Sequence, residues 1–308
     1  MFLHQHEENF KRAVKYVAEK TCINPVLVEQ DYFQMMLLRQ IRQESGVSIV
    51  FNDSYSVQSA YMGIERPQSM LEIMLPLKQF KVAHTESKLF SAVMKSFNTL
   101  GLHSTLASTS HDIPVTEFWV DYPSYFCAEG VASRFLLRLS TEIPVFPTRK
   151  KTVGSILGKT LSIEGTGYYD FSDFVVKVAS PCRVLIDRLF DLTEAYEKSD
   201  FTSGALHLYE LYCLIGMFDW DNTKVVDKLH RLYKKVLPYR MKVPEVTPGV
   251  SGETLAVFLH KNLISGVLDS DELDKAYCSI PSVVGEVPFV VCVSWVLDLL
   301  ESGKILKV

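Results

Sequence analysis

The sequence lacks the short motifs by which many nucleotide-dependent and hydrolytic enzymes are recognised. It contains no G-x-x-x-x-G-K-[ST] loop, no G-x-G-x-x-G turn after a strand, no H-E-x-x-H pair and no G-x-S-x-G elbow. The segment GSILGKT, at residues 154–160, has the wrong spacing for a phosphate-binding loop and lies within a helical pattern. Any catalytic function must therefore rest on residues outside these motifs.

Cysteine pairs and a strong net charge are missing as well. The six cysteines form no C-x-x-C pair, which predicts reduced thiols rather than a disulfide or zinc framework. The net charge of -4 and the pI of about 6.1 give no global attraction for nucleic acid or anionic membrane, although a local basic patch is compatible with them. We expect neither DNA nor a membrane as a partner.

Long apolar runs are also absent. The opening MFLHQHEENF lacks the apolar run of a signal peptide, and we expect a cytoplasmic protein. The most apolar stretch, residues 287–297, is shorter than the roughly 18–20 residues that cross a bilayer, and it predicts a docked helix. A solvated pair is the expected state of His4 and His6, with a metal site as the alternative.

What is present is a strand-rich first part followed by a helical second part. Asn24-Pro25 and Ser180-Pro181 each combine a helix N-cap with proline at the first helical position. The pattern predicts an α+β protein with parts at 1–180 and 181–308. Apolar runs predict strands at 47–51, 70–77, 115–121, 133–141 and 174–178, and helical spacing predicts helices at 8–20, 26–45, 85–99, 182–198, 204–218 and 222–236.

Several segments carry a family resemblance through their order along the chain. They are LHQHEENFKRAV, INPVLVEQDYFQMMLLRQI, IVF-turn-SAY-GIER, DYPSYF, VKVASPCRVLIDRLFDL, ALHLYELYCLI and GEVP. Together they resemble the AbiEii family of nucleotidyltransferase toxins. Typical sequence segments of that family are an E-K-D-Y-W helix, a V-F-K-G-G-T-S-L-S-K-A-Y segment and an I-E-R-F-S-E-D-I-D-L segment. The resemblance covers nearly the whole chain.

This resemblance implies a nucleotidyltransferase-like mixed β-sheet core with a mostly helical C-terminal part. Family members move a nucleotide from an NTP to RNA, in known cases to the 3′ end of tRNA, and many have a neighbouring antitoxin. The chemistry uses carboxylates on adjacent strands to hold Mg²⁺, and a small-residue turn that lets backbone N–H groups approach phosphate. NTP, tRNA and an antitoxin-like protein are therefore the expected partners, and Mg²⁺ the expected cofactor of an active enzyme.

The residues that fall on the family's phosphate and metal positions have changed. The K-G-G-T-S-L-S-K turn falls on residues 52–59, which gives Asp53, Ser54 and Ser56 as nucleotide-binding positions, although Asp53 places an anion where phosphate is expected. Arg66, in the matched I-E-R, is a phosphate-binding candidate or the partner of Glu65. The metal-binding D-x-D falls on Met70 and Glu72, and thioether sulfur is a poor ligand for Mg²⁺.

A third acidic position falls on Arg138, with Glu142 close by. The family's E-K and Y-D pairs become Asp187-Arg188 and Tyr209-Glu210 in the helical half. Glu72, Arg188 and Glu210 are thus the candidate catalytic residues, Glu72 is the remaining metal ligand, and Arg138 is a nucleotide-binding candidate. The alternatives are a cap or a pair with a surface acid for Arg188, an internal salt bridge for Glu210 and a solvent-facing strand position for Glu72.

The leading hypothesis is a nucleotidyltransferase-fold protein of weak or lost activity, a pseudoenzyme in a toxin–antitoxin or abortive-infection setting. The alternatives are an active divergent enzyme that uses Glu72, Glu142 and Glu210, and an interaction protein that shares only the fold. If the family cleft persists, Arg188 and Glu210 should face the mouth of the sheet, and Arg138 with Arg188 should make that cleft electropositive.

Overall fold

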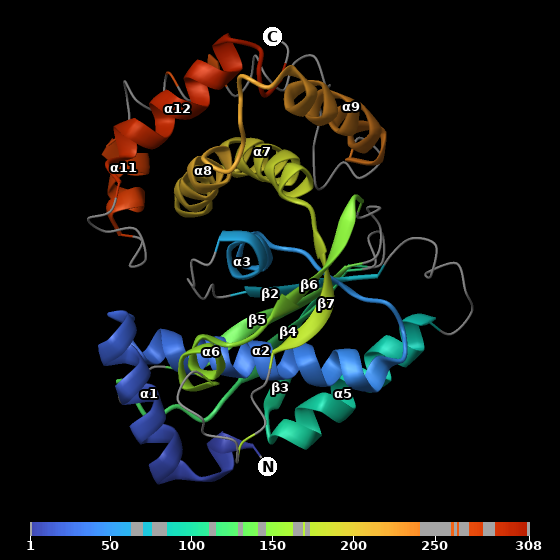
Figure 1. The fold of residues 1–308 in the computed structure, drawn as a ribbon, viewed down its shortest axis with the longest axis vertical. Helices are drawn as coiled ribbons and strands as arrows, with labels where there is room; N and C mark the ends of the chain where they lie inside the picture. Colours follow the sequence, from blue (N-terminus) through green and yellow to red (C-terminus); the bar gives the residue numbers. More distant parts are fainter. Residues whose placement is uncertain are drawn as a thin grey trace. The chain divides into compact units, whose positions relative to one another are not determined.

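The computed structural model divides into two compact units, Met1–Ala179 and Ser180–Val308 (Figure 1). The residues that it describes are 2–62, 70–75, 85–110, 115–128, 132–140, 146–162, 169, 173–240, 260–261, 264, 271–279 and 287–306.

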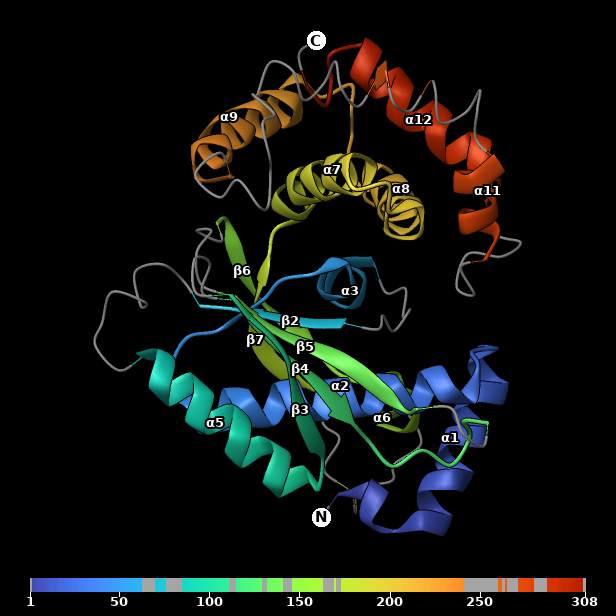
Figure 2. The ribbon, with the colours of Figure 1, turned by 180° about the vertical axis from the view of Figure 1, so that it is seen from behind.

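A seven-stranded mixed sheet forms the centre of the first unit (Figures 1 and 2). The strand order is β3-β4-β5-β2-β1-β7-β6. β1 runs antiparallel to β2 and parallel to β7, β2 runs parallel to β5, and the remaining neighbours are antiparallel. The strands are β1 (Val50–Phe51), β2 (Met70–Met74), β3 (His103–Ser110), β4 (Val115–Asp121), β5 (Arg134–Ser140), β6 (Thr148–Val153) and β7 (Phe174–Ala179).

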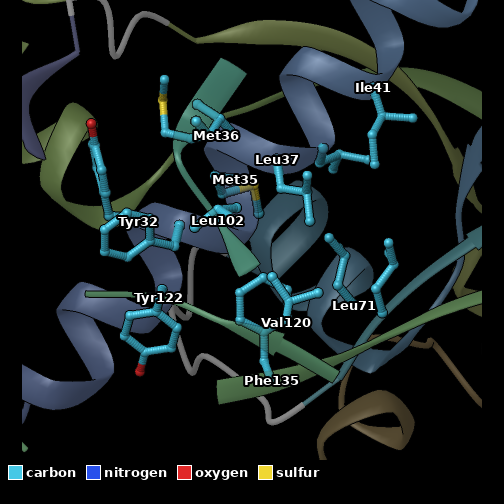
Figure 3. Packing of buried hydrophobic residues seen from close by; sticks show 14 of the residues in the cluster. Tyr32, Met35, Met36, Leu37, Ile41, Leu71, Leu102, Val120, Tyr122 and Phe135 are labelled. Atoms are coloured by element: carbon cyan, nitrogen blue, oxygen red, sulfur yellow. The ribbon is translucent and has the colours of Figure 1, made fainter. Parts of the chain in front are cut away.

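Helices cover one face of this sheet, and the core of the unit lies between them. Figure 1 shows α2 (Pro25–Ser45), α5 (Thr85–Leu100) and α6 (Ile156–Ser162) on the same side of the strands. Figure 3 shows how side chains of α2, among them Leu37 and Ile41, pack toward Leu71 of β2 and Phe135 of β5. Further helical segments among the described residues of the unit are α1 (Glu7–Thr21), the short α3 (Ser54–Val57), the 3-10 turn η1 (Leu3–Gln5) and the π-helical turn η2 (Gln58–Met62).

The predicted α+β class is confirmed, and the two strands that were not predicted share a physical cause. The strands predicted at 115–121, 133–141 and 174–178 are β4, β5 and β7, and β1 is confined to the end of the run predicted at 47–51. The two edge strands were not predicted. β3 reads HSTLASTS and β6 reads TRKKTV, and edge strands need few apolar residues because they are only partly covered.

The expectation that His4 is solvated is wrong. The His4 side chain is buried; its Nδ1 lies 3.0 Å from the Tyr32 hydroxyl and its Nε2 lies 3.1 Å from the carbonyl oxygen of Leu100. Burial lowers the pKa of His4 below its ordinary value, although the hydrogen bond to the Leu100 carbonyl has a smaller effect in the opposite direction. His4 therefore joins the N-terminal segment to α2 and to the end of α5, a contact that spans too many residues to be visible in the sequence.

The second unit is helical in its described part. It contains α7 (Pro181–Glu197), α8 (Phe201–Ile215), α9 (Thr223–Arg240), α11 (Asp271–Cys278) and α12 (Phe289–Glu301). Ser180 caps α7 as predicted, since its side chain accepts a hydrogen bond from the Arg183 backbone N–H. The helix predicted at 222–236 extends further, because α9 continues through Pro238 to Arg240.

The structure also bears on the expectations for the apolar stretch at residues 287–297 and for the cysteines. The apolar stretch near residue 290 forms α12, whose buried side chains include Phe289 and Val296. Among the described residues, no helix combines the length and apolarity that a membrane span requires. All six cysteines are free thiols.

Candidate functional site

The candidate site lies on the sheet face that carries Glu72 and Arg138, which we call the polar face. Residues in direct register on neighbouring strands share a face. Glu72 of β2 is opposite Arg138 of β5, Arg138 is opposite Glu117 of β4, and Glu117 is opposite Ser108 of β3. A row of polar side chains therefore crosses four adjacent strands, whereas the alternate residues of the same strands, such as Leu71 and Leu137, are fully buried in the core.

Asp53 occupies the beginning of α3 with its own carboxylate. Its Oδ1 accepts a hydrogen bond from the Ser56 backbone N–H at 2.5 Å, and the Ser56 hydroxyl in turn accepts from the Asp53 N–H at 3.2 Å. The other oxygen, Oδ2, accepts from the Glu72 backbone N–H at 3.1 Å. Asp53 and Ser56 are both fully buried. In the turn that the resemblance assigns to phosphate binding, the carboxylate of Asp53 thus accepts the backbone hydrogen bonds itself, and together with Ser56 it forms a reciprocal helix cap.

Glu72 is held by the neighbouring strands. Its Oε1 accepts a hydrogen bond from the Ser140 hydroxyl at 3.1 Å, and its Oε2 lies 3.5 Å from the side-chain nitrogen of Asn52. The Asn52 backbone N–H also donates to the carbonyl oxygen of Glu72 at 3.1 Å. Glu72 is therefore a half-buried, hydrogen-bonded strand residue that keeps part of its surface in solvent.

Arg138 stands at the position where a third carboxylate is expected, and an acid on the next strand compensates it. Its Nε lies 2.8 Å from Oε1 of Glu117, whose Oε2 accepts a hydrogen bond from the Ser108 hydroxyl at 2.7 Å. Burial alone would raise the pKa of Glu117, but the Ser108 bond and the Arg138 charge together bring this pKa below its ordinary value. Glu117 remains ionised and holds the guanidinium in place.

These residues do not fit a magnesium site. Mg²⁺ needs a near-octahedral set of hard oxygen ligands, usually with one or two carboxylates directed at the ion. Here Met70 supplies a thioether, a guanidinium lies in register beside Glu72, and both oxygens of Asp53 accept backbone hydrogen bonds. Within the described residues, no three His, Cys, Asp or Glu side chains come close enough together to hold a metal ion.

The E-Q-D-Y segment of α2, which carries part of the family resemblance, supports the core. Glu29 accepts hydrogen bonds from the Ser124 hydroxyl and from the Tyr125 backbone N–H, the latter at 2.9 Å. Asp31 accepts from the Tyr55 hydroxyl, and from the Ile156 backbone N–H at 2.6 Å. These two buried carboxylates join α2 to α3, to the start of α6 and to the segment after β4, and this explains the motif without assigning it a catalytic role.

Arg188 and Glu210 are brought together inside the second unit. Nε of Arg188, on α7, lies 3.2 Å from Oε2 of Glu210, on α8, and its Nη1 donates to Asp191 at 2.8 Å. His207 Nδ1 lies 3.2 Å from the same Glu210 oxygen. The side chains of Arg188 and Glu210 are 7% and 2% exposed, and Arg188 is paired with two acids of its own unit. For Glu210, these contacts favour the internal salt bridge over the catalytic role, and an electropositive cleft that includes Arg188 stays a prediction.

The pair belongs to a longer chain of buried charges. Asp187, the other half of the matched pair, accepts from Arg183 at 2.7 Å and from Arg240 of α9 at 3.1 Å. Arg240 also lies 3.3 Å from Asp191, which connects this part to Arg188. Alternating charges thus join α7, α8 and α9. The prediction that Arg188 and Glu210 face the sheet concerns the relation between the two units and stays a prediction.

Asp53, Ser56, Glu72 and Arg138 thus meet on adjacent elements of the first unit, while Arg188 and Glu210 meet in the second. Arg66 and Glu142 lie outside the described residues. Ser54 begins α3 and is described only through its backbone.

The charged residues of the polar face that sequence reasoning missed include Glu117, Lys150 and Lys177. Glu117 could have been found from the alternation in VTEFWVD, which places it on the face opposite Phe118. Lys150 of β6 and Lys177 of β7 are opposite one another in register, and neither the RKK run nor the single lysine of FVVKVA indicates this pairing.

The sequence matches no protein-family model and no curated protein. Solved structures that are similar to the chain over most of its length include the following two. JHP933 from Helicobacter pylori is 12% identical, with a TM-score of 0.44 over 90% of this chain and 94% of that chain. A candidate nucleotidyltransferase from H. pylori is 14% identical, with a TM-score of 0.43 over 90% of this chain and 96% of that chain.

Proposed function

We propose that this chain is a nucleotidyltransferase-fold protein whose transfer of nucleotides from NTP to RNA is weak or lost. It persists as a binding protein in a toxin–antitoxin or phage-defence setting. The family assignment rests on the ordered segments of the sequence, which resemble AbiEii proteins from the first helix to the last. The mixed sheet supports it, since β1, β2 and β5 are adjacent, as the resemblance requires of the strands that carry the acids.

A single observation carries the loss of activity: Arg138 lies in register beside Glu72. In a metal-dependent transfer, carboxylates on these strands hold the cation that bridges the triphosphate and lowers the pKa of the attacking hydroxyl. A guanidinium at this position repels a divalent cation, and its pairing with Glu117 engages the nearest alternative carboxylate. Loss of one electrostatic group in a preorganised site commonly slows a reaction by about 10² to 10³.

The turn before α3 supports the same conclusion. A phosphate group would meet the carboxylate of Asp53 where the family offers free backbone N–H groups, and the N–H groups of Ser56 and Glu72 are already donated to that carboxylate. Glu72 alone could contribute only one ligand to a metal. The site is therefore expected to bind Mg²⁺ weakly and to lack the geometry of transfer.

The test is label transfer from each of the four NTPs to total tRNA, with Mg²⁺ or Mn²⁺, for the wild type and for Glu72→Gln. We expect no transfer from either protein. Robust transfer by the wild type that disappears in Glu72→Gln would sink this proposal and establish the divergent enzyme in its place. Calorimetric titration of the same NTPs with and without Mg²⁺ complements the assay, and metal-independent binding is the expected result.

A further inference from the structure

The charges of the polar face are unevenly compensated. In the described sheet, this face carries four lysine or arginine side chains: Arg134, Arg138, Lys150 and Lys177. The two arginines, both on β5, each have an acid in register on β4, since Arg138 is opposite Glu117 and Arg134 is opposite Asp121. Arg134 also covers the ring of Trp119 at 4.7 Å. The charge of Arg138 is thus paired with Glu117, and Arg134 has an acid in register beside it.

The two lysines have no such acid. Lys150 of β6 and Lys177 of β7 are directly opposite one another in an antiparallel pair. Like charges in this arrangement destabilise a sheet. The neighbour of Lys177 on its other side is Val50 of β1, and no carboxylate of the described residues forms an ion pair with either ammonium group. Lys150 is exposed and Lys177 half-buried, so an external ligand can reach both.

Protection of a sheet edge explains only one of these lysines. Edge strands commonly carry lysine because its charge prevents pairing with another chain. β6 is an edge strand, and Lys150 together with its neighbour Arg149 fits that role. β7 lies between β1 and β6 and needs no such protection, so the position of Lys177 is left without a structural reason.

We propose that Lys150 and Lys177 form a binding site for phosphate oxyanions on the polar face. This inference rests on the proposed function, because it locates the retained ligand binding at β6–β7 instead of at the turn near Asp53. Residues directly opposite one another on paired strands have Cβ atoms typically about 5 Å apart. The two ammonium groups can therefore both contact one phosphate group. Its negative charge converts their repulsion into two favourable contacts, and lysine serves here as a point charge for phosphate.

The source of the phosphate is either an NTP or the backbone of single-stranded RNA, and the experiment separates them. The probes are ATP, inorganic pyrophosphate and a twelve-nucleotide single-stranded RNA, each without metal and at several salt concentrations. The variant is Lys150→Gln/Lys177→Gln. The matched control, Lys15→Gln/Lys88→Gln, removes the same charge from exposed positions on α1 and α5.

We expect the Lys150→Gln/Lys177→Gln variant to lose pyrophosphate binding and the control to keep it. If RNA is the source, the steepness of log affinity against log salt should also decrease in this variant by about 0.7, the value for one phosphate that is no longer neutralised on a single strand. If an NTP is the source, ATP binding is lost and RNA binding is unchanged. Equal losses in variant and control, or pyrophosphate binding retained in the variant, would overturn the proposal.

A charge-reversed variant tests the cost of the lysine pair independently. Lys150→Glu places an acid opposite Lys177, so it should raise the urea midpoint of unfolding and abolish pyrophosphate binding at the same time. A lower midpoint would show that the lysine pair is not strained, and it would contradict the proposal. Because these measurements involve no transfer step, they remain interpretable whether the protein proves to be an active enzyme or not.

Discussion

At the scale of single residues, two positions that the family resemblance assigns to ligand binding make contacts within the chain. Asp53 stands in a turn where phosphate is expected, and its carboxylate closes the turn by binding the N–H groups of Ser56 and Glu72. Arg138 stands where an acid is expected and is paired with Glu117. Each residue thus makes an interaction within the chain where the resemblance predicts an interaction with a ligand.

Asp53→Ala should destabilise the protein by about 2–4 kcal/mol. Loss of a helix cap costs about 1 kcal/mol, and each buried N–H left unsatisfied costs about 1–3 kcal/mol. The measurement is urea unfolding of this variant beside Asp53→Asn, which keeps one acceptor oxygen and should lose less than half as much. The control is Asn24→Ala, the cap of α2, whose side chain accepts from a single N–H. An Asp53→Ala midpoint equal to that of the wild type would show that the carboxylate is not a structural cap.

At the scale of elements, buried ion pairs join the helices of the second unit. Arg188 and Glu210 connect α7 to α8, and Arg240 connects α9 to Asp187 and Asp191 of α7. Charges this deeply buried stabilise a fold only as long as every member keeps its partner, because an isolated buried charge has lost its hydration. The network therefore selects one packing of the three helices.

Glu210→Leu should cost about 3 kcal/mol, since removal of one partner of a buried ion pair costs about 3–5 kcal/mol and Arg188 retains Asp191. The double variant Arg188→Met/Glu210→Leu should recover part of this loss, because no unpaired charge remains. Chemical unfolding of both single variants and the double variant gives the coupling free energy. The control is the ion pair between Glu194 of α7 and the exposed Lys198 that follows this helix, and Lys198→Met should change stability by less than about 0.5 kcal/mol. A Glu210→Leu variant of unchanged stability that loses a ligand or an activity would restore the catalytic interpretation.

At the scale of the whole molecule, the chain divides into two compact units. The described core cluster of the first unit extends from Leu3 to Val178, and the helices of the second unit bury their own set, which includes Leu185, Leu208 and Val296. Domains with their own cores generally fold as units. Each unit should therefore respond mainly to substitutions in its own interior.

The three tryptophans can report this behaviour separately. Trp119 lies in the first unit, and Trp220 and Trp295 lie in the second. In protein labelled with 5-fluorotryptophan, Asp53→Ala should lower the urea midpoint of the Trp119 signal alone, and Glu210→Leu should lower those of Trp220 and Trp295 alone. If all three signals shift together in both variants, the two units unfold as one cooperative structure.

The sequence by itself determined the class of the fold, the capped starts of α2 and α7, and the strands with strong apolar patterns. These features depend on residues within one turn or one strand, so local spacing reveals them. The edge strands β3 and β6 escaped prediction, because their partly covered positions are filled by serine, threonine, lysine and arginine.

Only the tertiary structure decided what the charged residues do. The contacts of His4 with Leu100, Glu72 with Ser140 and Arg138 with Glu117 join residues far apart in the chain, and the opposition of Lys150 and Lys177 depends on strand register. Shifting a strand by one residue exchanges its two faces. A side chain's role as a ligand-binding residue or an internal partner therefore follows from which strand lies beside it, and that is fixed by burial of the core on the opposite face.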